Sequence, residues 1–182
     1  QDFFSAMQNS VSDPASTPAR QLVINQAESL SVRFNNLYSR LAETEKSVNG
    51  EISNIAGKIN LLATSIANLN QSIGVKSASN SGGQANDLYD QREEALRQLA
   101  ELTSVQLVND NVGNINVFIG NGEPLVVGIN TSTLTTDTSG AIFFKNGATA
   151  FNITDSIVGG KLGGSLLFKR DALEPAFNEL GR

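Results

Sequence analysis

The sequence predicts an α+β fold in which a long, coiled-coil-like helical bundle carries a small antiparallel β meander. Two observations lead to this prediction. From Val23 to Ile73 an apolar residue returns every three or four positions, which places these side chains on one stripe of a helix. After Thr103 the apolar spacing changes to two, which is typical of strands with one buried face. The chain is accordingly divided into a helical part (1–104), an antiparallel β meander (105–158) and a closing helix that packs back on the helical part (159–182).

The first elements are a short helix and a very long one. Residues 2–9 form an amphipathic helical pattern, and a turn-like stretch follows it. Thr17-Pro18 is a start signal, with Thr as the N-cap and Pro at the first helical position. A stripe as long as the one that follows requires partner helices to cover it. Its members are Val23, Ala27, Leu30, Phe34, Leu37, Leu41, Val48, Ile52, Ile55, Ile59, Leu62, Ile66, Leu69 and Ile73.

The stripe is interrupted once, between Leu41 and Ile52. The spacing there is eleven residues instead of seven, with Thr44 in the intermediate slot, which is typical of a stutter in a coiled coil. Asn49-Gly50 lies in this interval and favours a turn, because Gly costs about 1 kcal/mol inside a helix. Since the stripe keeps its face after the interruption, we expect one continuous helix over 18–73. A hairpin of two shorter helices is the alternative.

The remaining elements follow from local signals. The small, polar stretch 75–85 predicts a flexible connection, after which Asn86 or Asp87 caps a second helix. In that helix Glu93 and Arg97 are spaced for an i, i+4 ion pair. A closing helix begins after two pairs of glycines, and Pro175 is expected to kink it. Between them we expect five or six short strands, marked by Val105/Leu107, Ile115/Val117/Ile119, Leu125/Val127, Ile142/Phe144 and Phe151/Ile153.

The composition excludes several classes of function. The 182 residues contain no Cys and no His, which removes the usual ligands of zinc, copper and iron together with thiol and imidazole catalysis. The net charge is −5, and 105–158 holds four acids against one base, Lys145. Such a surface does not suit a nucleic acid, and no apolar run approaches the ~20 residues of a membrane span. We therefore expect no catalytic residue, no metal, no cofactor, no nucleic acid and no membrane.

The strongest candidate for chemistry is a group of carboxylates on the second helix. Asp87, Asp90 and Glu94 share one helix face and could hold a cation or act as an acid–base pair. Acids near a helix start beside Arg92 and Arg97 have a simpler explanation, because they cap the helix and form surface ion pairs. We favour that explanation.

Two glycine motifs are better explained by backbone geometry than by ligands. Gly159-Gly160-Lys161 lacks the preceding Gly of a phosphate loop, because Asp155 stands there, and no Ser or Thr follows the lysine. We interpret these glycines as a hinge between sheet and helix. Gly120-Asn121-Gly122 lies between two predicted strands and has no third Gly, so it is expected to form a hairpin turn.

With this organisation established, the sequence resembles the first hook-associated proteins of bacterial flagella, which form the junction between hook and filament. The resemblance covers essentially the whole chain. The Asp90-Gln91-Arg92 motif and the Gly120–Gly128 block are its most specific parts. It is carried by 2–4, 12–15, 19–20, 86–92, 114–128, 159–164 and 170–176.

The resemblance implies a rod-like, flagellin-like domain and a structural axial protein that joins hook to filament by lateral and axial helix packing. It implies an extracellular place in the flagellum after export through the flagellar secretion channel. The implied partners are copies of itself, the hook protein and hook-associated protein 3, with an export chaperone for the full-length protein. The family's extreme N-terminal segment, outer domain and returning C-terminal helices are missing, so we expect an internal fragment.

Two alternatives remain open at this point. One is another flagellar axial protein, of the flagellin or hook-associated protein 3 type, although the Gly120–Gly128 block speaks against it. The other is an enzyme or ligand-binding module that uses the carboxylates of 87–94 or a sheet edge. The lack of nucleophiles and bases in the composition favours the structural role.

Overall fold

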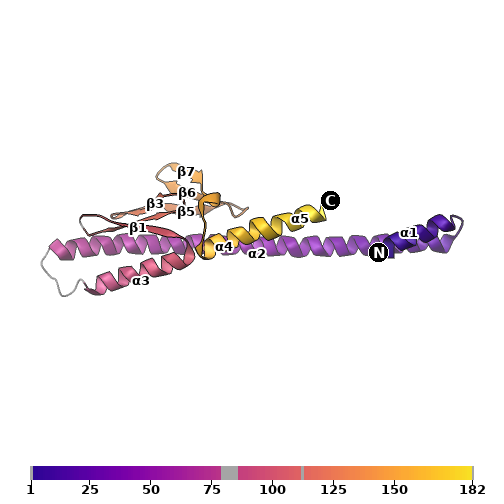
Figure 1. Ribbon diagram of the computed structural model, residues 1–182, viewed down its shortest axis with the longest axis horizontal. Coiled ribbons are helices and arrows are strands. Elements are labelled where there is room, and N and C mark those ends of the chain that lie inside the picture. Colours follow the sequence, from indigo (N-terminus) through magenta and orange to yellow (C-terminus); the bar gives the residue numbers. More distant parts are fainter. Residues whose placement is uncertain (1, 79–85, 112, 182) are drawn as a thin grey trace. The chain divides into compact units, whose positions relative to one another are not determined.

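The computed structural model describes residues 2–78, 86–111 and 113–181 (Figure 1). It is an α+β fold, as the sequence predicts. The helical elements are α1 (Asp2–Ser12), α2 (Thr17–Ala78), α3 (Asn86–Leu102), the 3-10 turn η1 (Thr154–Ser156), α4 (Gly160–Phe168), the π-helical turn η2 (Lys169–Leu173) and α5 (Glu174–Leu180). The strands are β1 (Val105–Asn109), β2 (Ile115–Ile119), β3 (Glu123–Val127), β4 (Asn130–Thr131), β5 (Thr133–Thr136), β6 (Ile142–Asn146) and β7 (Thr149–Asn152).

Helix α2 runs unbroken through Asn49-Gly50, which confirms the prediction of a continuous helix. Tertiary contacts explain why the turn signal is overridden. The side-chain Nδ2 of Asn49 donates to the carbonyl of Thr138 at 3.2 Å, and its Oδ1 accepts from Nζ of Lys169 at 3.2 Å. The predicted N-cap at Thr17 was wrong by one residue, because the backbone N–H of Ala19 donates to Oγ of Ser16.

The chain forms two compact units, each of which contains part of α2. One unit consists of the described residues up to Glu45 and those from Leu173 onward, and the other is Lys46–Ala172. The three-part division predicted from the sequence follows the type of secondary structure, whereas the two units are defined by compactness. The three-part division stays a prediction.

The apolar stripe of α2 is buried in the second unit and exposed in the first. Ile52, Ile59 and Ile66 have no exposed surface, whereas Phe34 and Leu37 are 48% and 47% exposed. The second unit supplies the cover, since α3 runs beside this half of α2 (Figure 1) and the sheets pack near it. The core of this unit includes Leu99, Val117, Ile119, Leu125, Leu134, Ile142, Phe144 and Leu162.

The strands of the described chain form two antiparallel sheets rather than one meander of five or six strands. Their orders are β1-β2-β3-β4 and β5-β6-β7. The sequence pattern missed β5 because Leu134 is its single apolar residue, too few to show alternation. It also expected Leu125 and Val127 to share the buried face. A register shift between Val117 and Phe118 buries Leu125 and Val126 instead.

Backbone geometry explains how the closing helical segment starts and where its helical turn widens. Gly160 has φ +62°, and a Cβ there would lie 2.5 Å from the carbonyl carbon of Leu102, so only glycine fits against the end of α3. At the place of the predicted kink lies a π-helical turn, Lys169–Leu173, followed by Glu174 and Pro175. Pro175 cannot donate to the preceding turn and its ring crowds that turn's carbonyl, which favours a wider turn at this place.

Candidate functional site

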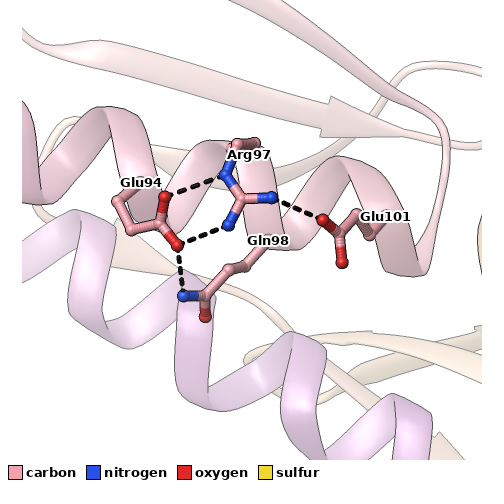
Figure 2. A network of polar contacts seen from close by, with 4 residues as sticks. All are labelled: Glu94, Arg97, Gln98 and Glu101. Carbon is pink, nitrogen blue, oxygen red and sulfur yellow. Dashed lines mark hydrogen bonds and ion pairs between the residues drawn. The ribbon is translucent and has the colours of Figure 1, made fainter.

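Two carboxylates of α3, Glu94 and Glu101, form a surface network around Arg97 (Figure 2). The guanidinium of Arg97 donates to Oε1 of Glu94 and to Oε1 of Glu101, each at 2.6 Å, and Gln98 donates to Glu94 at 2.7 Å. The predicted pair of Glu93 with Arg97 was therefore wrong, because the acid three residues before Arg97 reaches it instead. The side chains of Arg97, Glu94 and Glu101 remain 60%, 49% and 50% exposed.

These contacts fix the charge state of Glu94. The hydrogen bond from Arg97, and then the one from Gln98, lowers the pKa of Glu94 to about 2. The same contacts, Glu94 first, raise the pKa of Arg97 above its usual range. At neutral pH Glu94 is thus a carboxylate that accepts hydrogen bonds and has no proton to give. Among the described residues, no group of three or more acidic side chains could hold a metal ion.

Arg92, whose place among acids on α3 predicts a surface pair, is instead buried with 6% of its surface exposed. Its Nη1 donates to Oδ1 of Asn70 at 2.9 Å and to the carbonyl of Gly113 at 3.0 Å. Its guanidinium carbon lies 5.2 Å from the centre of the Tyr89 ring, within range of a cation–π contact. Burial lowers the pKa of Arg92, and the charges of Tyr89 and Asp110 oppose that effect.

Asn70 lies at the centre of the same buried cluster, which we call the Arg92–Asn70 joint. Its Nδ2 donates to the carbonyls of Ile115 at 3.0 Å and Gly128 at 2.7 Å, and its Oδ1 accepts from the N–H of Ile115 at 3.2 Å. The joint therefore ties α2, α3, the start of β2 and the turn after β3 together. Every polar group named here has a partner, as a buried polar group requires.

Asn60 ties α2 to the second sheet in a similar way. Its Nδ2 donates to the carbonyl of Leu134 and its Oδ1 accepts the N–H of the same residue, both at 2.8 Å. Asn49, Asn60 and Asn70 are eleven and ten residues apart, about three helical turns each, so they share one face of α2. We call these residues the asparagine row. Their spacing was visible in the sequence, but each could equally have been a solvent-facing amide.

This arrangement can fix two sheets on a helix, and its polar groups are engaged with one another. Together with the exposed apolar face of α2 in the first unit, it defines the class of domain: an α+β domain built on one long helix whose apolar stripe is covered over only part of its length. No described helix is both long and apolar enough to cross a membrane.

Comparison with known proteins gives the particular family. The chain belongs to the family described as flagellar hook-associated protein FlgK helical domain, which matches residues 1–182. The predicted resemblance is thereby confirmed.

Individual relatives agree with this assignment. Flagellar hook-associated protein 1 of Salmonella typhimurium is 31% identical over 190 residues, covering 100% of this chain and 34% of that protein. The Escherichia coli K12 protein of the same name is 30% identical over 100% of this chain and 35% of its own length. The flagellar hook junction protein FlgK from Burkholderia pseudomallei has a similar structure, with a TM-score of 0.85 and 32% identity over 98% of this chain and 34% of that one. The chain thus spans about a third of the length of these relatives.

Proposed function

We propose that the protein containing this chain is a structural axial component of the bacterial flagellum and joins the hook to the filament. The observation that carries this proposal is the family match over the whole chain, together with the close structural likeness to a hook junction protein. The role is extracellular and non-enzymatic, with export through the flagellar secretion channel and help from an export chaperone. It requires no cofactor, metal or catalytic residue.

The two halves of the apolar stripe support this role in different ways. The buried half, from Val48 to Ile73, gives the second unit a firm core. The exposed half presents Leu30, Phe34 and Leu37 in the first unit. Contiguous exposed apolar side chains of this kind mark a surface that packs against a partner. The partners are copies of the same protein and the neighbouring axial proteins, namely the hook protein and hook-associated protein 3, bound by lateral and axial helix packing.

A test in flagellated cells uses the full-length protein with Phe34→Glu and Leu37→Glu in place of the wild type. Two charges on the exposed stripe should weaken helix packing, so electron microscopy should show hooks without attached filaments. The matched control is Asn35→Glu, which adds a charge to the same exposed helix segment outside the stripe. Normal filament attachment by the double variant, with wild-type amounts of exported protein, would contradict the proposal.

A further inference from the structure

Two of the sheet edges in the described chain are blocked, and two are open. Strand β4 has only two residues, and Asn60 occupies both the N–H and the carbonyl of Leu134 in β5. The open edges are β1, with the sequence VQLVN, and β7, with the sequence TAFN. Neither contains the charge or proline that usually protects an edge strand from pairing with another chain.

The register of the β1–β2 hairpin shows which backbone groups of β1 point outward. The N–H of Asp110 donates to the carbonyl of Asn114 opposite it, so hydrogen-bonded pairs alternate along the strands from this pair. Val105, Leu107 and Asn109 then occupy the non-hydrogen-bonded positions, and their N–H and C=O groups point away from β2. The bonds of Ile115, which faces Asn109, support this register. Its N–H and carbonyl are bonded to Asn70 and not to β1, as expected at a non-hydrogen-bonded position.

The same stretch of β1 borders an open groove of about 880 Å³ between the strand and α3. Val105, Leu107 and Asn109 line it from the sheet, and Leu96 and Ala100 line it from the helix. Leu107 faces Val117 across the ladder, so the two side chains lie on one face of the sheet. Val117 has no exposed surface, whereas Leu107 is 48% exposed. This inward face is therefore only partly covered.

The charges along the groove restrict what can cover it. Asp90 and Glu93 lie on its α3 wall, and within the described residues neither forms an ion pair, whereas Glu94 is paired with Arg97. Arg92 also lines the groove, but its Nη1 is held by the Arg92–Asn70 joint. An occupant should therefore combine an extended backbone with a basic side chain.

We propose that β1 pairs with strand β7 of a second copy of this chain. Strand β7 is the other open edge, and all four of its residues are exposed. Its Ala150 faces Lys145 of β6, the one basic residue in 105–158. The face of the β6–β7 hairpin that carries Ala150 and Lys145 would then point toward α3 of the first copy. In this orientation Lys145 of the second copy comes near Asp90 and Glu93 of the first.

The pairing joins two different edges, so the contact is head-to-tail. Such a contact repeats from copy to copy into a ring or a helical array instead of closing as a pair. The inference rests on the assembly role proposed above and names one lateral contact within it.

Cysteine crosslinking tests the pairing in isolated flagella. The 182 residues contain no Cys, and any cysteine elsewhere in the full-length protein is replaced by Ser. Facing residues of paired strands lie within the Cα separation that a disulfide spans. Leu107→Cys is therefore combined with Ala150→Cys or with Asn152→Cys, to allow for register. Oxidation should give a ladder of multimers from at least one double variant and only monomers from each single variant. The control pair, Leu107→Cys with Asn54→Cys, should also stay monomeric.

Three outcomes would overturn the pairing. Dimers from Leu107→Cys alone would show β1 against β1, and multimers from the control pair would show unspecific contact. Attached filaments without crosslinked multimers from either double variant would reject the strand pairing and leave the junction role standing, which the stripe variants test separately.

Proline substitutions give a second measurement. Leu107→Pro removes an outward N–H without removing a ladder hydrogen bond, so the fold should melt near the wild-type temperature while filaments detach at lower shear. Val108→Pro removes an N–H directed at β2 and should lower the melting temperature itself. Wild-type filament attachment by a folded Leu107→Pro protein would also contradict the pairing.

Discussion

At the scale of single residues, the asparagine row lets a helix satisfy strand backbones. A carboxamide carries a donor and an acceptor side by side, as a peptide group does, so Asn60 can bond both polar groups of Leu134. Aspartate lacks the donor and alanine lacks both groups. The row therefore depends on residue type and not only on polarity.

Replacement of Asn60 by Ala should lower the free energy of unfolding by about 1–3 kcal/mol, because it leaves the two groups of Leu134 without their partner. Asn54→Ala is the matched control, since Asn54 is exposed on the same helix, and it should change stability by no more than about 0.5 kcal/mol. Urea titration measures both. Equal losses from the two variants would show that the amide contacts of Asn60 contribute nothing specific.

Sequence patterns could identify little of the Arg92–Asn70 joint. The missing Cys and His exclude whole classes of chemistry from composition alone. The burial of Arg92 depends on partners that only the folded chain brings near, one on α2 and one in the loop after β1. An arginine between acids on a helix otherwise reads as a surface residue. The one available signal was the Asp90-Gln91-Arg92 motif, which pointed to the family and not to the contact.

At the scale of elements, apolar periodicity predicted the helices and strands that bury one face at regular intervals. Helices α2 and α3 follow from the 3.6-residue pattern, and β2 and β6 follow from alternation. The division into two sheets did not follow, because strand pairing is decided by tertiary packing. The register shift near Val117 is also invisible to a two-residue pattern.

The stripe of α2 should contribute to stability only where it is covered. Ile66 has no exposed surface, so Ile66→Ala should cost about 2–5 kcal/mol through lost burial and the remaining cavity. Leu30 is 37% exposed in the first unit, so Leu30→Ala should cost much less. Urea titration of the two variants measures the two losses of stability. Similar small losses would mean that the half of the stripe in the second unit is also uncovered in solution.

The Glu94 network should make the folded chain less stable as the pH falls. The pKa of Glu94 in the folded chain is about 2, below its ordinary value of 4.5. The contribution is therefore present above the unfolded pKa and is lost as the pH falls from about 4.5 toward 2. Salt should weaken it, because the groups are exposed.

Melting temperatures measured across this pH range test the effect. The Glu94→Gln variant should lose less stability on acidification than the wild type, while Glu93→Gln, the control beside it on α3, should behave as the wild type does. If Glu94→Gln and the wild type lose the same amount, the network has no measurable effect.

At the scale of the whole molecule, the exposed half of the stripe should make the isolated chain associate. Leu30, Phe34 and Leu37 lie on one helix face and are about 37–48% exposed. Analytical ultracentrifugation over about a hundredfold range of concentration should show association that grows with concentration. Phe34→Glu with Leu37→Glu should weaken this association. A monomer at every concentration, or a fixed oligomer, would show that this face does not drive association.

The two hydrogen bonds that fix the side chain of Asn49 should also slow its deamidation as the protein ages. Asn-Gly pairs deamidate when the glycine nitrogen attacks the asparagine side chain and closes a succinimide ring. In α2 the amide of Asn49 is held by Thr138 and Lys169, and the helical backbone keeps the Gly50 nitrogen away from it. At the exposed Asn146-Gly147 turn between β6 and β7, no described residue holds the side-chain amide of Asn146 in this way. Peptide mapping of stored protein should find deamidation at Asn146 first. Deamidation at Asn49 would then record how long the chain has spent unfolded.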